Sequence, residues 1–104
     1  METHCSNIAK LNDKFRKTWQ DVVFTPGVMT GIADHLGLAH VVESFSSFDE
    51  DNDPYGEHDF GALMFEGQKV FFKVDYYDQT LSHWCDPLDS RCRRIMTVLL
   101  AEEY

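Results

Sequence analysis

Residues 49–59 hold six carboxylates within eleven positions, DEDNDPYGEHD. Side chains of this kind coordinate divalent cations, act as general bases, or present negative charge to a basic partner. A turn interrupts the run, because the segment NDPYG at residues 52–56 is rich in residue types that favour tight turns. The simplest interpretation is a solvated acidic turn, and each kind of chemistry has to be weighed against it.

A calcium loop is the first alternative. Asp49, Asp51 and Asp53 are spaced like the first ligands of an EF-hand loop, which also needs glycine at its sixth position and a bidentate acid at its twelfth. Pro54 and Phe60 occupy those two positions, so the EF-hand interpretation fails. A looser Ca²⁺ or Mg²⁺ site in the same run stays open.

A zinc site is the second alternative. His83, Cys85 and Cys92 offer three ligands without the paired C-x-x-C spacing that positions a tetrahedral zinc ion. Cys92 also falls on the apolar face of an expected helix, where a thiol usually acts as a small apolar side chain. We therefore expect no metal and no cofactor. The three cysteines, which include Cys5, are expected to be reduced, since no export signal precedes them.

A metal-dependent hydrolase or nuclease is the third alternative. Glu57, His58 and Asp59, with Asp75 nearby, could supply a general base, its orienting carboxylate and a metal ligand. No serine or cysteine nucleophile stands in a recognisable setting, and the sequence has no glycine-rich phosphate loop. The structural interpretation is that His58 and Asp75 pair across two strands and fix the acidic turn to a sheet.

A β-hairpin is the clearest element of the sequence. Two β-prone segments, residues 59–65 and 68–78, flank the dipeptide Glu66-Gly67, which suits a two-residue turn. Counting outward from this turn gives the register. It places Phe65 opposite Gln68, Leu63 opposite Val70, Gly61 opposite Phe72 and His58 opposite Asp75.

Alternation along the second strand then assigns two faces. One face is the expected core and carries Val70, Phe72, Val74 and Tyr76. The other face carries an ionisable trio of His58, Lys73 and Asp75, which a one-residue change of register would separate. With Tyr76, this trio is either a structural link or the alternative active site.

Helical patterns surround the hairpin. A stripe of Ile8, Leu11, Phe15 and Trp19 predicts a helix over residues 7–19, a short strand covers residues 21–25, and one or two helices cover residues 28–48. Residues 86–104 predict a closing helix with an aspartate N-cap and proline at the first helical position. The expected fold class is α+β in a single domain, residues 1–104: a small antiparallel sheet, the hairpin plus one short strand, packed against about three helices.

Negative charge is concentrated in the middle of the chain. The formal net charge is −9, and residues 43–78 account for −8 of it with ten acidic residues and two lysines. Such a surface repels nucleic acid and attracts cationic surfaces or metal ions. The expected partner-binding residues are Asp49, Glu50, Asp51, Asp53, Tyr55, Glu57 and Asp59.

The sequence gives no sign of a membrane protein. No apolar run approaches the roughly 18 residues of a membrane span, and the N-terminus lacks the apolar segment of a signal peptide. We therefore expect a cytoplasmic protein without membrane or direct nucleic-acid contacts. Self-association through an exposed β edge or an aromatic face, giving a homodimer, is a further possibility.

Several segments resemble an uncharacterised family of short bacterial proteins that is known only as a domain of unknown function. They are LNDKFR, VVFTPGV, DNDPYGEHDFGAL, VFFKVDYYD and LAEEY, and the resemblance spans residues 8–104. The signature NDPYGEHDFG implies that residues 52–61, with residues 75–77, matter to its members, but it implies no catalytic assignment. Around SHWCDPLDSRC the sequence departs from the family pattern.

The resemblance also suggests a setting. Members of this family occur on plasmids and in phage-derived regions, where small acidic inhibitors are common. By analogy with anti-CRISPR and anti-restriction proteins, we expect a non-enzymatic domain that binds a basic surface of a host-defence nuclease complex, with its carboxylates imitating a phosphate backbone. The metal-dependent hydrolase or nuclease stays open as the alternative.

Overall fold

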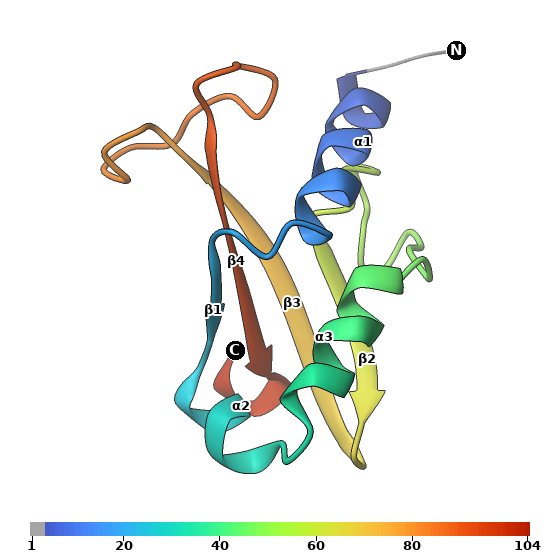
Figure 1. The fold of residues 1–104 in the computed structure, drawn as a ribbon. Helices are drawn as coiled ribbons and strands as arrows, with labels where there is room; N and C mark the ends of the chain where they lie inside the picture. Colours follow the sequence, from blue (N-terminus) through green and yellow to red (C-terminus); the bar gives the residue numbers. More distant parts are fainter. Residues whose placement is uncertain (1–3) are drawn as a thin grey trace.

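Three helices lie against one face of a four-stranded sheet (Figure 1). The computed structural model describes residues 4–104, and side chains are described from Asn7 onward. The strand order is β1-β4-β3-β2, with β1 parallel to β4 and the other neighbours antiparallel. The elements are α1 (His4–Arg16), β1 (Val22–Phe24), α2 (Pro26–Gly31), α3 (His35–Ser44), β2 (Phe60–Phe65), β3 (Gln68–Tyr77), β4 (Arg93–Leu100) and the 3-10 helix η1 (Ala101–Glu103).

The α+β class is confirmed, but the sheet is mixed and the predicted closing helix is wrong. Residues 93–100 form β4, a central strand between β1 and β3. The strand contains an almost continuous apolar run, IMTVLL, and the spacing of these residues also fits a helix. Asp86 does not cap a helix; its Oδ1 accepts a hydrogen bond from the Leu88 amide at 2.9 Å.

The hairpin and its register are confirmed over β2. Leu63 pairs with Val70 and Gly61 with Phe72. Glu66 and Gly67 have φ values of 51° and 75°. Positive φ at both positions is what a type I′ turn, a preferred turn for two-residue hairpins, requires. The pairing of His58 with Asp75 is wrong, because β2 begins at Phe60 and the chain turns at His58, where φ is 56°.

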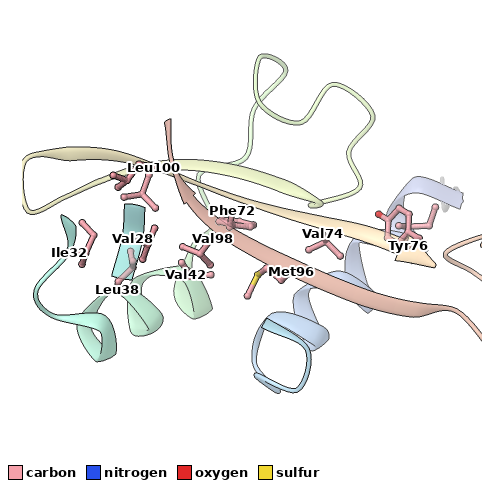
Figure 2. Packing of buried hydrophobic residues seen from close by; sticks show 12 residues of the cluster. Val28, Ile32, Leu38, Val42, Phe72, Val74, Tyr76, Met96, Val98 and Leu100 are labelled. Carbon is pink, nitrogen blue, oxygen red and sulfur yellow. The ribbon is translucent and has the colours of Figure 1, made fainter. Parts of the chain in front are cut away.

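The core lies between this sheet and the helices (Figure 2). The four residues predicted on the core face of β3 are all buried there, which confirms that face. Phe72, Val74 and Tyr76 run in a row along the sheet, with Leu100 beyond Phe72 and Tyr76 at the other end (Figure 2). The helices and β4 contribute Ile8, Val28, Ile32, Leu38, Val42, Met96, Val98 and Leu100.

Gly61 marks a point where the sheet and a phenyl ring are in close contact. A Cβ atom at Gly61 would overlap the ring of Phe72. We expect Gly61→Ala to destabilise the protein by about 1–3 kcal/mol, as overpacking of a filled core does. Gly31→Ala is the matched control, since its Cβ would lie 3.4 Å from the nearest atom. Urea unfolding measures both, and equal midpoints for the two variants would contradict the expectation.

In the part of the chain that the structure describes, no helix is long and apolar enough to cross a membrane.

Candidate functional site

Helix α1 turns polar side chains toward the sheet. Asn12 is fully buried and Arg16 is 2% exposed, on the same face of the helix as Ile8. Leu11, which the sequence predicted on the buried stripe, is 41% exposed. The buried face of α1 is therefore rotated away from the predicted apolar stripe. Asn12 and Arg16 occupy the middle and the end of this buried face.

Asn12 joins four segments of the chain. Its Nδ2 donates to the hydroxyl of Tyr76 at 2.8 Å and to the backbone carbonyl of Glu57 at 3.0 Å, and its Oδ1 accepts from Nε of Arg94 at 2.7 Å. The Tyr76 hydroxyl in turn donates to Oε1 of Glu57 at 3.0 Å. Burial, with the carboxylates of Asp59 and Glu57 nearby, raises the pKa of Tyr76, so the phenol stays a neutral donor.

Arg16 fixes the point where α3 ends. Its Nε and Nη2 donate to the carbonyls of Val42 and Phe45 at 3.2 and 3.0 Å, which caps the last turn of α3. Its guanidinium lies 5.2 Å from the ring centre of Phe48 and 5.4 Å from that of Phe72. A single buried cation thus holds the first residues of the segment that leaves α3.

The segment between α3 and β2, residues 45–59, is the acidic loop (Figure 1). His58 fastens its end to α1, because its Nδ1 lies 2.8 Å from Oδ1 of Asp13. The same oxygen accepts from Nη1 of Arg16 at 2.9 Å. The imidazole also stacks on Phe48, with ring centres 3.9 Å apart and planes at 5°. The predicted role of His58 in fixing the loop is thus carried out through α1 instead of Asp75.

The predicted ionisable trio is only partly assembled. Lys73 and Asp75 form an ion pair at 3.4 Å. His58 lies in the acidic loop, against Asp13 and Phe48, and takes no part in that pair. Glu57 binds Tyr76, so Glu57, His58 and Asp75 of the hydrolase alternative each have a different partner.

Asp53 organises the interior of the acidic loop. It is buried, and its carboxylate accepts from the amides of Glu57 at 3.0 Å and His58 at 3.1 Å. Asp49 organises the preceding turn in the same way, accepting from the amides of Asp51 at 2.9 Å and Asn52 at 3.0 Å. Asp53, expected among the partner-facing residues, therefore supports the loop from inside.

The other acidic side chains of the loop differ in exposure, and Asp49 and Glu50 border an open hollow. Asp49, Glu50 and Asp51 are exposed and Tyr55 is 75% exposed, whereas Glu57 and Asp59 are half-buried. A hollow of about 660 Å³ lies between α1 and the acidic loop. Its walls include Ala9, Lys10, Asp13, Phe48, Asp49, Glu50 and Tyr55.

Candidate metal ligands stay apart. Among the side chains that the structure describes, from Asn7 onward, no group of three or more His, Cys, Asp or Glu residues is placed to hold a metal ion. His83 pairs with Asp78 at 3.3 Å, and Cys85 and Cys92 are free thiols. The side chain of Cys5 lies outside the described residues.

Asp59 makes stability depend on pH. Burial, with the charge of Glu57 next in weight, raises its pKa from 3.8 to about 6. The folded chain therefore binds this proton more readily than the unfolded chain, so stability rises as pH falls from about 6 to 4. Above pH 6 the buried carboxylate is ionised, and its full destabilising effect is present.

We expect Asp59→Asn to stabilise the protein at pH 7.5 by about 1 kcal/mol, a value reduced for the half-exposed site, and to flatten this pH profile. Chemical unfolding at pH values between 4 and 7.5 measures it, with Asp51→Asn, an exposed acid of the same loop, as the charge-matched control. If the stability of Asp59→Asn depended on pH as that of the parent does, Asp59 would not be the source of this pH dependence.

The sequence model of a family of proteins of unknown function, DUF3768, matches residues 24–103. The chain belongs to the DUF3768 family. No curated protein and no solved structure matches it. The matched range of the DUF3768 chain includes the acidic loop, Tyr76 and Arg94, whereas Asn12, Asp13 and Arg16 of α1 precede it.

Sequence reasoning missed five residues of this DUF3768 site. Arg94 fell within the predicted closing helix, and Phe48 was not singled out. Asn12 and Arg16 follow Ile8 at spacings of four and eight, which place all three on one helical face, whereas Asp13 lies outside that spacing. The spacing is a signal for the shared face, but only apolar residues were counted when the buried stripe was assigned.

Proposed function

We propose that this chain is a non-enzymatic, cytoplasmic domain that binds a basic protein surface through its acidic loop. The observation that carries the proposal is that some polar side chains of the loop are exposed to solvent while others hold its backbone in place. Asp49, Glu50 and Asp51 are exposed, while Asp53, His58 and other inward groups hold the backbone. Negative charge is thus presented on a loop whose shape is already set.

A preset loop lowers the cost of binding. Arg16 fixes its start, Asp53 its middle and the Asp13–His58 pair its end. Binding then orders few additional groups, so more of the electrostatic attraction contributes to affinity. Attraction between exposed charges also accelerates association and weakens as salt increases.

The hollow beside the loop suits a cationic side chain. Asp49 and Glu50 supply negative charge at its rim, and Phe48 and Tyr55 supply aromatic surface. Arginine and lysine gain from both kinds of contact. Proteins that bind nucleic acid expose many such side chains, so a nuclease complex of a CRISPR or restriction system is the partner class that we propose.

The test is protein capture from a cell lysate at two salt concentrations, with identification by mass spectrometry. The test bait carries Asp49→Asn, Glu50→Gln and Asp51→Asn, changes that keep the side-chain oxygens on which the Asp49 turn depends. We expect at least a tenfold loss of a partner with a basic surface, since three exposed charges contribute to its attraction.

A matched bait controls for net charge. It carries Asp86→Asn, Asp89→Asn and Glu102→Gln, three acidic residues outside the loop. The parent and this control are expected to retain the partner at low salt and release it at high salt. Identical protein sets on all three baits would refute the proposal.

A metal-dependent hydrolase or nuclease is the second candidate. Its supporting observation is the imidazole of His58, which lines the hollow and is oriented by Asp13 as a general base would be. Calorimetric titration with Mg²⁺ and Mn²⁺ tests it. Binding heat that disappears in His58→Ala supports this candidate, and a flat titration of the parent protein eliminates it.

A further inference from the structure

Strand β2 has a row of unused backbone groups. The amide of Val74 donates to the carbonyl of Asp59 at 2.8 Å, which sets the alternation of this antiparallel ladder. Alternate residues of β2, starting at Gly61, then bond to β3, and the N–H and C=O groups of Phe60, Ala62 and Met64 point outward. Within residues 4–104, no other segment hydrogen-bonds to these outward groups.

This edge lacks the usual protection against pairing with another strand. Strand β2 is the outermost strand of the sheet (Figure 1), and its sequence FGALMF contains no charged residue and no proline. Met64 is 64% exposed. Sheet edges are normally shielded by charges, proline, bulges or short length. The opposite edge follows that rule, because β1 has only three residues.

We propose that β2 pairs with β2 of a second copy of this chain, antiparallel across a two-fold axis at Ala62. Ala62 then faces its own equivalent, and Phe60 faces Met64 of the second copy on each side of the axis. All three pairs use the outward groups, which gives about six new backbone hydrogen bonds. Each Phe60 gains a thioether contact, a favourable partner for an aromatic ring.

The charges of the chain favour a second copy in this orientation. An uncharged strand can face itself without repulsion, although the chain as a whole carries −9. The acidic loop enters β2 at Phe60, so antiparallel pairing places the two loops at opposite ends of the joint strand pair. Each loop then lies near the hairpin end of the other copy, where Lys69 stands opposite Met64 in β3.

The open face of the sheet extends the same contact. Phe60, Phe71 and Tyr104 form an aromatic cluster there, with the ring of Phe60 5.1 Å from that of Phe71 and 5.9 Å from that of Tyr104. Phe60 thus belongs both to this cluster and to the proposed strand pair. Each dimer would have a continuous sheet, with the two acidic loops at opposite ends of the joint strand pair in its middle.

Two edge variants and one control test the proposal by sedimentation equilibrium over a range of concentrations. Ala62→Pro removes an outward amide that β3 does not use, and Met64→Lys places a charge at the edge. Met29→Lys, on α2 at 52% exposure, matches the second change away from β2. We expect dimers for the parent and for Met29→Lys, and at least a tenfold weaker dimer for both edge variants.

Amide hydrogen exchange supplies a second readout, which depends on the register. The amides of Phe60, Ala62 and Met64 should be protected at concentrations where the dimer forms and exchange on dilution. The amides of Gly61 and Leu63 should stay protected throughout. A parent chain that is monomeric at every concentration, or edge variants that dimerise like the parent, would overturn the proposal. The loop variant with Asp49, Glu50 and Asp51 neutralised should still dimerise, which separates this result from the partner-binding test.

Discussion

Replacing Arg16 by methionine is expected to destabilise the protein by about 3 kcal/mol. The substitution keeps an unbranched stem between the rings of Phe48 and Phe72 but removes the guanidinium. The carbonyls of Val42 and Phe45 then lose their donors in a site where the replacement offers none. Because Arg16 holds the start of the acidic loop, amides in residues 45–59 should also exchange faster.

Urea unfolding and hydrogen exchange measure these two effects. Lys14→Met is the matched control, since Lys14 is an exposed cation on the same helix and the charge change is identical. An exposed substitution of this kind should change stability by no more than about 0.5 kcal/mol. Equal stability of the two variants would show that Arg16 does not support the loop.

The hairpin was predictable because its information is local. The turn pair Glu66-Gly67 has the conformation that a two-residue loop demands, and counting from it gave the pairing of Gly61 with Phe72. The core face of β3 followed from simple alternation. Register in such a strand is strongly specified, because a shift of one residue would move its whole apolar face into solvent.

Strand β4 was not predictable in this way. Its residues Met96, Val98 and Leu100 are buried because β1 and β3 flank it on both sides and helices cover one face. Apart from β3, the segments that create this environment, β1 and the helices, lie far from β4 in the sequence. An apolar run of this length fits a helix as well as a central strand when periodicity alone is considered.

The residues of the acidic loop were predictable from the sequence, but the contacts that hold the loop in place were not. The sequence predicted the acidic loop and a role for His58 in fixing it. It assigned Asp75 as the partner of His58, whereas the structure has Asp13. Asp13 is 45 residues away and belongs to another element. Hairpin counting could not reach it, since the regular strand geometry ends before His58.

Three links from α1 now explain why a loop rich in like charges has one shape. Repulsion among six carboxylates favours an extended loop. Asp53 offsets this by accepting amide bonds, and the links through Arg16 and His58 attach the loop at both ends. The third link, through Asn12, ties the loop to β3 and β4 as well and is therefore the one whose loss should spread furthest.

Replacing Asn12 by leucine is expected to destabilise the protein by about 2–4 kcal/mol. Leucine has a similar size, so the dominant loss is of hydrogen bonds and not of volume. The Nε of Arg94 and the carbonyl of Glu57 both lose their partner, and the hydroxyl of Tyr76 loses a donor. Asn7→Leu, at an exposed position of the same helix, is the matched control.

A double-mutant cycle with Tyr76→Phe separates a coupled network from independent contacts. Tyr76→Phe removes the hydroxyl that Asn12 and Glu57 share. If the three groups act together, the double variant should lose about 1 kcal/mol less than the sum of the two single variants. Strict additivity would mean that Asn12 and Tyr76 stabilise the fold through separate contacts and not as a coupled network.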